Sequence, residues 1–441
     1  MTEPFALRVA GLTKIFGRHP ADAVERLHAG AEPAELGTAA TAAVIDANFD
    51  VRPGEIFVVM GLSGSGKSTL IRMLNGLLEP TAGTVTVGGD VITGIAPKRL
   101  REIRRSRISM VFQHFALLPH WTVIQNVAYG LELQGKRKEA RLARAQEVIE
   151  LVGLAGWSNH LPDQLSGGMR QRVGLARALA ADTDVLLMDE AFSALDPLIR
   201  REMQEQLVEL QSKLNKTIIF ITHDLNEAMF LGDRIAVMRN GRIVQIGTPE
   251  DILTDPANDY VAQFVQDVDR ARVLTAGSVM ETARATVSVS AGPRAALRVM
   301  RDLQTSAAFV VGRDRRLLGV ARDGDAMRLV RSGTGTLESI TTDDYAAVNA
   351  DTALIDLFVP SVESPLPLAV TSDDGRLLGV VPRVTLLAAL GNITNTGELP
   401  VVEPPPTVPL AVISEILEAT AESATDRDPA SDSTSTTGAS A

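Results

Sequence analysis

The sequence predicts an α/β fold followed by a duplicated α+β module, and three observations carry this prediction. An apolar run from Ile56 to Met60 leads into a glycine-rich loop and then a helical pattern. Two more apolar runs, Val185 to Met188 and Ile218 to Ile221, are typical of buried parallel strands followed by helices. Nearer the C-terminus, Arg316-Leu-Leu-Gly-Val320 recurs 60 residues later as Arg376-Leu-Leu-Gly-Val380, which indicates an internal repeat.

The N-terminal part of the α/β domain contains a predicted strand pair and an insertion. Residues 44–60 have the pattern of a strand, a Pro53-Gly54 turn and a second strand. The Ala-rich residues before this pair favour a helix but offer few core positions. We therefore expect residues 18–43 to form a surface insertion within an α/β domain that extends over residues 1–269.

The duplicated motif defines a second module over residues 270–395. An apolar strand precedes each copy, Phe309 to Val311 in the first and Leu368 to Val370 in the second, and an apolar helix follows each. This order predicts two βαββα units. Residues 396–441 are rich in Pro, Ser, Thr and acids, with too little apolar surface to offset the entropy of ordering, so a disordered acidic tail is predicted.

Composition limits the classes of function. The net charge of −11 argues against a nucleic-acid binder, because phosphate backbones require a surplus of Lys and Arg. The absence of cysteine excludes disulfides and favours a reducing compartment. The first ten residues lack a signal-peptide pattern, and no window is apolar enough to span a bilayer, so we expect no insertion into a membrane.

The segment Gly61-Leu-Ser63-Gly64-Ser65-Gly66-Lys67-Ser68-Thr69 has the spacing and context of a phosphate-binding loop. Glycines let the backbone N–H groups wrap phosphates, the following helix adds a positive dipole, and Lys67 neutralises the outer phosphates. Ser68 is a candidate Mg²⁺ ligand. A flexible Gly/Ser turn is the plain alternative, but a turn alone does not need this spacing between a strand and a helix.

Two other motifs are weak alone and strong in combination. Asp189 and Glu190 end a buried strand, where Asp189 could hold Mg²⁺ through water and Glu190 could orient an attacking water. Leu165-Ser166-Gly167-Gly168-Met-Arg-Gln171 has the pattern of a helix start that could meet an anion. Taken singly, the first would be an ordinary solvated strand end and the second an ordinary helix cap.

Together these segments resemble the ATP-binding cassette (ABC) family, and its motifs follow in order. They are the phosphate loop from Gly61 to Thr69, Gln113, the signature from Leu165 to Gln171, Asp189-Glu190, Ser193-Ala-Leu-Asp196 and His223. The resemblance covers about residues 5–265 and implies a P-loop ATPase domain with a helical subdomain.

The resemblance also implies roles for single residues. Phe16 would stack on adenine, Gln113 would sense Mg²⁺ and the γ-phosphate, Glu190 would be the general base, and His223 would position the γ-phosphate. In a head-to-tail homodimer, the signature of one copy would close over ATP and Mg²⁺ held by the other, and Asp196 would couple the two sites. Gln113 and His223 follow predicted parallel strands, so both are expected at the carboxyl edge of one sheet.

Within the family, the nearest resemblance is to the ATPase subunit of glycine betaine/proline importers. This resemblance rests on the sequence from Glu55 to Gly66, on the insertion after Phe16, and on the repeat, which resembles a pair of cystathionine-β-synthase (CBS) domains. Such a subunit works at the cytoplasmic face of the membrane with an integral permease, and indirectly with a substrate-binding protein. Asp325 matches a nucleotide-contacting position of CBS domains, but Thr385 replaces it in the second copy.

Charge along the chain is uneven. From Arg270 to Arg331, twelve arginines face five acids, whereas residues 396–441 hold eight acids and one arginine. Such clusters are commonly just solvated surface. The alternative hypothesis is that the basic module contacts anionic lipid or the acidic tail, and that rising ionic strength screens this contact and activates transport.

Other functions remain open at this stage. An ABC importer ATPase for another small solute and a non-transport ABC ATPase of DNA repair or translation are alternatives. The chain lacks the long coiled-coil insertion of the repair proteins and the second cassette of the translation proteins. A pure sensor protein is a third alternative, which the intact Glu190 disfavours. The choice among betaine, choline, carnitine and proline depends on partners outside this chain.

Overall fold

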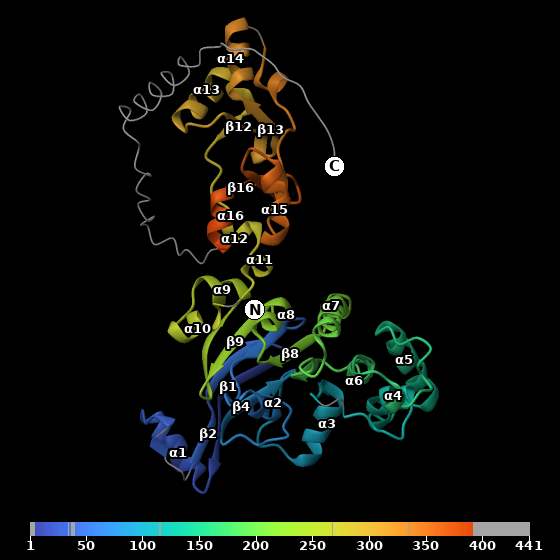
Figure 1. The fold of residues 1–441 in the computed structure, drawn as a ribbon. Helices are drawn as coiled ribbons and strands as arrows, with labels where there is room; N and C mark the ends of the chain where they lie inside the picture. Colours follow the sequence, from blue (N-terminus) through green and yellow to red (C-terminus); the bar gives the residue numbers. More distant parts are fainter. Residues whose placement is uncertain are drawn as a thin grey trace, which may run out of the picture. The chain divides into compact units, whose positions relative to one another are not determined.

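The fold of this chain is drawn in Figure 1 from a computed structural model. It describes residues 5–390, apart from residues 34, 37–39, 114, 115, 267 and 334. The predicted tail, 396–441, and the last five residues of the predicted second module therefore lie outside the described residues. Within the described part of the chain, no helix is both long enough and apolar enough to cross a membrane.

A six-stranded sheet forms the centre of the N-terminal domain. Its order is β10-β9-β3-β8-β7-β6, and all neighbours are parallel except β10 and β9. The strands are β3 (Ile56–Met60), β6 (Ile108–Val111), β7 (Val185–Asp189), β8 (Thr217–Thr222), β9 (Arg234–Arg239) and β10 (Arg242–Gly247). The predicted strands at 56–60, 185–188 and 218–221 are confirmed, and they are neighbours in the sheet.

Both faces of this sheet are buried, which explains why its strands are nearly continuous apolar runs. In β8, Ile218 and Phe220 pack into one core, whereas Ile219 and Ile221 pack into another on the opposite face. Helices α2 (Lys67–Leu74) and α7 (Pro197–Leu214) contribute to these two cores, α2 to the second and α7 to the first. Buried parallel strands bring their carboxyl ends to one edge, which becomes the site described below.

A second, four-stranded sheet has the order β2-β1-β4-β5. Its strands are β1 (Leu7–Gly17), β2 (Ala40–Val51), β4 (Ala82–Val87) and β5 (Asp90–Val91). The predicted turn at Pro53-Gly54 joins β2 to β3 and thereby links the two sheets. Helix α3 (Pro97–Arg107) follows and buries only Ile103, so its arginines lie on a mainly exposed helix.

A helical subdomain interrupts the central sheet between β6 and β7. It consists of α4 (Val123–Leu133), α5 (Lys138–Leu151) and α6 (Gly167–Ala180), which pack on one another and project together from the sheet (Figure 1). The amide of Asn126 is fully buried in α4, and its Nδ2 donates to the carbonyls of Leu118, Trp121 and Thr122. These bonds fix the loop that enters the subdomain, because each satisfies a buried polar group.

The insertion at residues 18–43 contains the expected helix, α1 (Pro20–His28), but it has more core residues than the few that the sequence led us to expect. Ala23, Val24 and Leu27 of α1 are buried together with Leu36 and with Ile15 and Ile45 of the adjoining strands. The helical spacing of three small or medium side chains is enough to form a satellite core against β1 and β2. The low count of large apolar residues concealed this in the sequence.

The N-terminal domain ends in short helices that follow β8 and β10 in the chain. They are α8 (Leu225–Leu231), α9 (Pro249–Thr254) and α10 (Asp259–Phe264). Asp224 caps α8, Thr248 caps α9 and Asn258 caps α10, each with a side-chain oxygen that accepts a backbone N–H of the first turn.

The C-terminal module has the predicted duplicated order. After α11 (Arg270–Val273) and α12 (Ala276–Val279), the first unit is β11 (Thr286–Ser288), α13 (Pro293–Asp302), β12 (Ala307–Val311), β13 (Leu317–Arg322) and α14 (Asp323–Ser332). The second unit is β14 (Ala347–Asn349), α15 (Leu354–Glu363), β15 (Leu368–Thr371), β16 (Leu377–Val381) and α16 (Arg383–Leu390). In each unit the first two strands are parallel and the last two antiparallel, so the βαββα prediction is confirmed.

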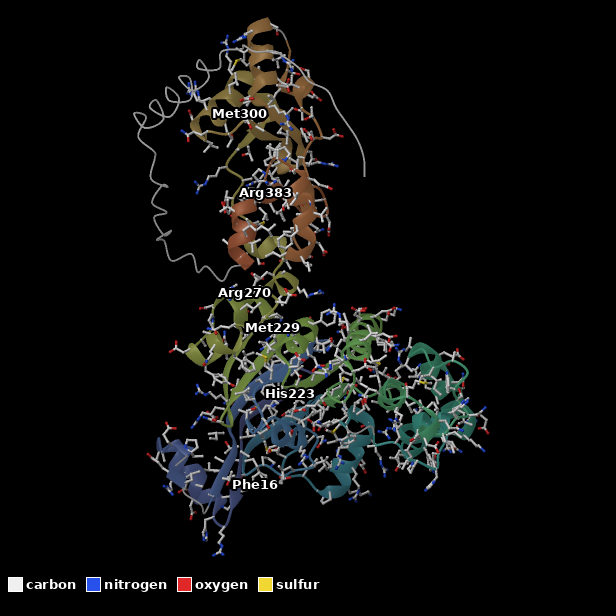
Figure 2. The ribbon with its side chains drawn as sticks, viewed as in Figure 1. Phe16, His223, Met229, Arg270, Met300 and Arg383 are labelled. Carbon is white, nitrogen blue, oxygen red and sulfur yellow. The ribbon has the colours of Figure 1, made fainter. Side chains whose placement is uncertain are left out.

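The two units contact each other through equivalent residues. Arg316 and Arg376, the first residues of the two repeated motifs, form an antiparallel bridge, and Phe309 and Val320 of one unit share a core with Val380 of the other. Within the second unit, Arg383 donates to the carbonyls of Ser361 and Ser364 at the end of α15 (Figure 2). A cation at a helix C-terminus satisfies the last carbonyls there.

Candidate functional site

The glycine-rich loop between β3 and α2 has a backbone that only glycine adopts easily. Gly61 has φ +155° and Gly66 has φ +104°. A Cβ atom would lie 2.3 Å from the Met238 carbonyl oxygen at Gly61 and 2.2 Å from the Ala43 carbonyl oxygen at Gly66. Because β2 and β9 approach the loop this closely, neither glycine tolerates a side chain.

The start of α2 has the donors that a polyphosphate requires. Among the described residues no side chain caps this helix, so the N–H groups of Lys67, Ser68 and Thr69 stay available to an anion. Ser63, Gly64 and Ser68 are exposed, whereas Ser65 is buried. A buried ammonium beside uncapped N–H groups suits phosphate oxygens, so the residues present fit this part of a nucleotide.

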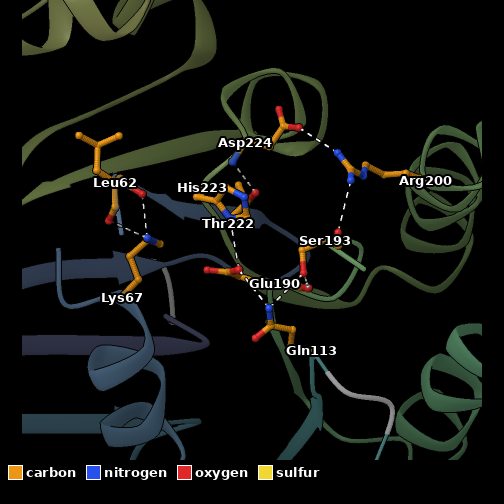
Figure 3. A network of polar contacts seen from close by, with 10 residues as sticks. Leu62, Lys67, Gln113, Glu190, Ser193, Arg200, Thr222, His223 and Asp224 are labelled. Carbon is orange, nitrogen blue, oxygen red and sulfur yellow. Dashed lines mark hydrogen bonds and ion pairs between the residues drawn. The ribbon is translucent and has the colours of Figure 1, made fainter. Parts of the chain in front are cut away.

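Lys67 lies within the loop rather than in solvent. Its side chain is buried, and Nζ donates to the carbonyl oxygens of Gly61 at 2.7 Å and Leu62 at 3.1 Å (Figure 3). Burial lowers the pKa of Lys67, and the nearby carboxylates of Glu190 and Asp189 act in the opposite direction. Any further negative charge at the loop therefore stabilises the protonated form of the Lys67 side chain.

Glu190, Gln113 and His223 meet at the carboxyl edge of the sheet, as expected from their places after β7, β6 and β8. Glu190 Oε2 lies 3.2 Å from His223 Nδ1 and 3.5 Å from Gln113 Nε2 (Figure 3). Glu190 is a non-glycine residue with φ +46°, and its backbone N–H donates to the Ile221 carbonyl at 3.0 Å. A strained backbone held by a neighbouring strand is typical of functional positions.

The cluster contains a residue to which the sequence analysis assigned no role. Ser193 Oγ donates to the Glu190 carbonyl at 2.9 Å and accepts from Gln113 Nε2 at 3.3 Å. It begins the Ser193-Ala-Leu-Asp196 motif, so the signal was present in the sequence. What the sequence could not give was that the turn folds back onto Glu190.

Asp189 lies beside this cluster at the end of β7 and is partly buried. Burial raises the pKa of Asp189, and the neighbouring Glu190 raises it further, whereas Arg72 and Lys67 lower it. A nearby cation would therefore stabilise the ionised form of the Asp189 carboxylate. Among the described residues, no three or more His, Asp or Glu side chains are grouped so that they could hold a metal ion.

Phe16 has the exposure expected of a stacking aromatic. Its side chain lies near the end of β1 and is 45% exposed (Figure 2), and Lys14 Nζ lies 5.3 Å from its ring centroid. An exposed aromatic that already accepts a cation over one face presents a π surface to a planar ring.

The Leu165–Gln171 segment divides into exposed and buried residues. Ser166 is exposed and caps α6, where its Oγ accepts the Met169 N–H at 3.2 Å. Gly167 and Gly168 open the helix, and a Cβ at Gly168 would lie 2.7 Å from Ile199 of α7. Leu165 and Gln171 are buried, so these two side chains do not face solvent as Ser166 does.

Asp196 stands at the start of α7, exposed, with Oδ1 accepting the Ile199 N–H at 3.0 Å. One and two turns later on α7 lie Arg200 and Gln204, which contact Asp224 at the start of α8 and Glu227 within it. Gln204 Nε2 donates to Glu227 Oε1 at 3.1 Å, and both side chains are buried. The sequence analysis did not single out Arg200, Gln204 or Glu227, because polar residues within a helix carry no local signal of burial.

The C-terminal module has a cavity of its own. A space of about 280 Å³ lies between the two units, lined by Phe309 and Val320 from the first and by Leu366 and Val380 from the second. Asp325 is not among the lining residues and forms an ion pair with Arg328 on α14. Thr385, which replaces it in the second unit, donates to Glu281.

Comparison with known proteins gives two family matches. Residues 44–193 match the family described as ABC transporter, and residues 276–332 match the CBS domain family. The first match contains the phosphate loop and Glu190, and the second contains the whole first repeat unit.

Relatives of similar length match most of the chain. The glycine betaine transport ATP-binding protein OpuAA of Bacillus subtilis is 50% identical over 88% of this chain and 93% of its own length. The glycine betaine/carnitine transport ATP-binding protein GbuA of Listeria monocytogenes is 50% identical over 88% of this chain and 98% of its own length. The glycine betaine/proline betaine transport system ATP-binding protein ProV of Escherichia coli is 45% identical over 87% of this chain and 97% of its own length.

Because Glu227 is buried, we expect the free energy of unfolding of the protein to depend on pH. Burial raises the pKa of Glu227 above its ordinary value, so between the two values the folded protein binds more protons than the unfolded chain. The free energy of unfolding therefore falls as the pH rises through that window. Each tenfold change in proton affinity corresponds to about 1.4 kcal/mol.

We expect Glu227→Gln, which has no proton to lose, to lack this component and to be more stable than the wild type at neutral pH. Urea unfolding of both proteins between pH 4.5 and pH 8 measures it. The matched control is Glu209→Gln, which removes an exposed carboxylate of α7. A wild type whose stability relative to the Glu227→Gln variant does not change with pH contradicts the assignment.

Proposed function

The chain belongs to the ATP-binding cassette transporter family, and we propose that it is the ATP-hydrolysing subunit that energises import of glycine betaine or a related quaternary amine through a membrane permease. The observation that carries the proposal is the convergence of Gln113, Glu190 and His223 at one sheet edge beside the Lys67 loop. These side chains supply charge stabilisation and a general base, which is what phosphoryl transfer to water requires.

ATP binding uses the loop from Gly61 to Thr69. The uncapped N–H groups at the start of α2 and the Lys67 ammonium hold the phosphates, and the exposed ring of Phe16 stacks on the adenine. Ser63, Gly64, Ser65 and Gly66 contribute backbone N–H groups, because only a glycine-rich loop can follow the phosphate surface closely.

Hydrolysis uses Glu190 as the general base toward the attacking water. His223 fixes the Glu190 carboxylate from one side and Gln113 from the other, at 3.2 Å and 3.5 Å. His223 is 55% exposed, so its remaining ring nitrogen is free to approach the γ-phosphate. Ser193 holds the Glu190 backbone and the Gln113 amide in this arrangement.

The residues beside the loop fit Mg²⁺. Ser68, Gln113 and Asp189 are the ligand set proposed for it, with Asp189 acting through water. Bound Mg²⁺ neutralises charge on the β- and γ-phosphates. A cation here also relieves the unfavourable burial of the Asp189 carboxylate, whose pKa is raised by desolvation and by Glu190.

A second copy of the chain completes each site. Ser166 and Gly168 of one copy close over the ATP held by the other, and Asp196 couples the two sites. Ser166 and Asp196 are exposed N-cap residues that directly precede α6 and α7, which suits groups that act between chains. Leu165 and Gln171 are buried and support the α6 start from within.

The permease docks on the helical subdomain. A cavity of about 580 Å³ there is lined by Leu133 of α4 and Met110 of β6, with arginines of α3 and α6 around it. Contact with a membrane partner from the cytoplasmic face suits this mixed apolar and basic lining. A substrate-binding protein acts on the permease and reaches this chain only indirectly, so the solute choice among betaine, proline and related amines lies with those partners.

Ionic strength regulates transport through the C-terminal module. The arginines between Arg270 and Arg331 give this stretch a net charge of +7, and an anionic lipid surface or the acidic tail is the partner of opposite charge. Salt screens such contacts, because the Debye length is about 8 Å at physiological ionic strength.

Replacing Glu190 tests the catalytic assignment. We expect Glu190→Gln to bind ATP as the wild type does but to lower kcat by about 10²- to 10⁴-fold, the usual contribution of a general base. Phosphate release and ATP affinity of the purified protein measure the two effects. Wild-type protein that fails to hydrolyse ATP, or a Glu190→Gln variant with full turnover, contradicts the proposal.

Bulk at Ser166 tests the second copy. We expect Ser166→Arg to retain ATP binding and to lower kcat by about 100-fold or more, because the side chain blocks closure over the partner's nucleotide. Ser166→Ala is the matched control, since it removes the same helix cap without adding bulk. Equal turnover by the Arg and Ala variants would show that this turn does not meet a second site.

Deleting residues after Asn395 tests the tail. We expect the truncated subunit, reconstituted with its permease in anionic vesicles, to shift the curve of ATP-driven uptake against salt. Vesicles of neutral lipid provide the comparison, because the basic module then has no anionic surface to contact. If truncation leaves the dependence of uptake on salt unchanged, the tail has no role in regulation. If that dependence is also the same in anionic and neutral vesicles, regulation by ionic strength is contradicted.

A further inference from the structure

The Arg200 side chain lies between two loops of the catalytic edge. Its Nη1 lies 3.3 Å from Asp224 Oδ2, and its Nη2 donates to the Ser193 carbonyl oxygen at 3.4 Å (Figure 3). The same Nη2 also donates to the Leu195 carbonyl oxygen at 3.2 Å. We propose that Arg200 is a positioning residue for hydrolysis, which links the turn after Glu190 to the segment that carries His223. The inference rests on the proposed ATPase function.

Two of the three partners of Arg200, Ser193 and Asp224, are direct neighbours of proposed catalytic groups. Ser193 bonds the Glu190 carbonyl and the Gln113 amide. Asp224 follows His223 in the chain, and its backbone N–H donates to Thr222 Oγ1 at 2.9 Å. One guanidinium therefore sets the separation between the Glu190 side and the His223 side of the cluster.

The Asp224 carboxylate is held from two directions. Its Oδ1 caps α8 by accepting the Glu227 N–H at 3.2 Å, while Oδ2 meets Arg200. One turn further along α7, Gln204 donates to Glu227. The two contacts, four residues apart on α7 and three apart on the Asp224–Glu227 segment, keep α7 and α8 in a fixed register.

The contacts of Arg200 should contribute little to the stability of the fold. The side chains of Arg200 and Asp224 are 28% and 33% exposed, so solvent screens their attraction. The Arg200 Nε–H is buried, and among the described residues it has no hydrogen-bond acceptor. A buried donor without an acceptor is costly, which points to a function beyond stabilisation.

The position of Arg200 on α7 suggests when it acts. Asp196, the residue proposed to meet the second copy, is the N-cap of helix α7, and Arg200 lies one turn later. Engagement of Asp196 shifts the start of α7, and Arg200 passes that shift to Asp224 and His223. Losing this link should misplace His223 and slow turnover, while the Lys67 loop still binds ATP.

Substituting each end of the contact tests the inference. Arg200→Gln and Asp224→Asn keep similar side-chain sizes, and Asn retains the ability to cap α8. We expect each variant to lower kcat by about 10- to 100-fold, the effect of a small misplacement of reacting groups, with the KM for ATP within about twofold of the wild type. We expect the double variant to fall no further than Arg200→Gln alone, because that substitution already removes the contact with Asp224.

Lys213→Ala is the matched control, since it removes an exposed cation of the same helix. Its kcat should equal that of the wild type, and thermal unfolding of all variants checks the fold. Should one single variant fail to fold, the other still gives the split between kcat and KM. Unchanged kcat in the folded variants, multiplicative losses in the double variant, or a rise in KM that matches the fall in kcat would each overturn the role of Arg200. Wild-type protein without ATPase activity would instead overturn the proposed function.

Discussion

Hydrogen bonding between the parallel strands β3, β8, β7 and β6 is the constraint on which the catalytic site depends. Parallel pairing places the carboxyl ends of all four strands at one edge, and burial of both sheet faces holds the register. The phosphate loop follows β3, His223 follows β8, Glu190 follows β7 and Gln113 closely follows β6. Gln113 and Glu190, 77 positions apart in the sequence, and Glu190 and His223, 33 positions apart, thereby come within hydrogen-bond distance.

Electrostatics at this edge favour a bound anion and cation together. Burial destabilises both the Lys67 ammonium and the Asp189 carboxylate, as the directions of their pKa shifts show. Phosphate groups would stabilise the charged form of Lys67, and the proposed Mg²⁺ would stabilise that of Asp189. Both directions agree with the magnesium nucleotide proposed as the ligand, which carries both signs of charge.

Two levels of polar contact surround the edge. Ser193, Gln113 and His223 touch Glu190 directly, whereas Arg200, Asp224, Gln204 and Glu227 hold the elements from which those side chains project. This second group joins α7 to α8, and the N-cap of α7 is Asp196, the residue proposed to face the second chain. In the C-terminal module, the βαββα pattern occurs twice, and the two copies bury a shared core between them.

The sequence by itself determined the strands, the phosphate loop, the signature segment and the duplicated module, because each depends on local spacing: apolar runs, glycines before a lysine, or a motif repeated at 60 residues. It also placed Gln113 and His223 at the sheet edge, since parallel strands share one carboxyl edge. Only the tertiary structure decided that α1 carries its own small core, that Gln171 is buried while Ser166 is exposed, and that Arg200 joins two loops. Those properties arise from contacts between residues distant in sequence, and burial of a polar side chain leaves no periodic trace in the chain that carries it.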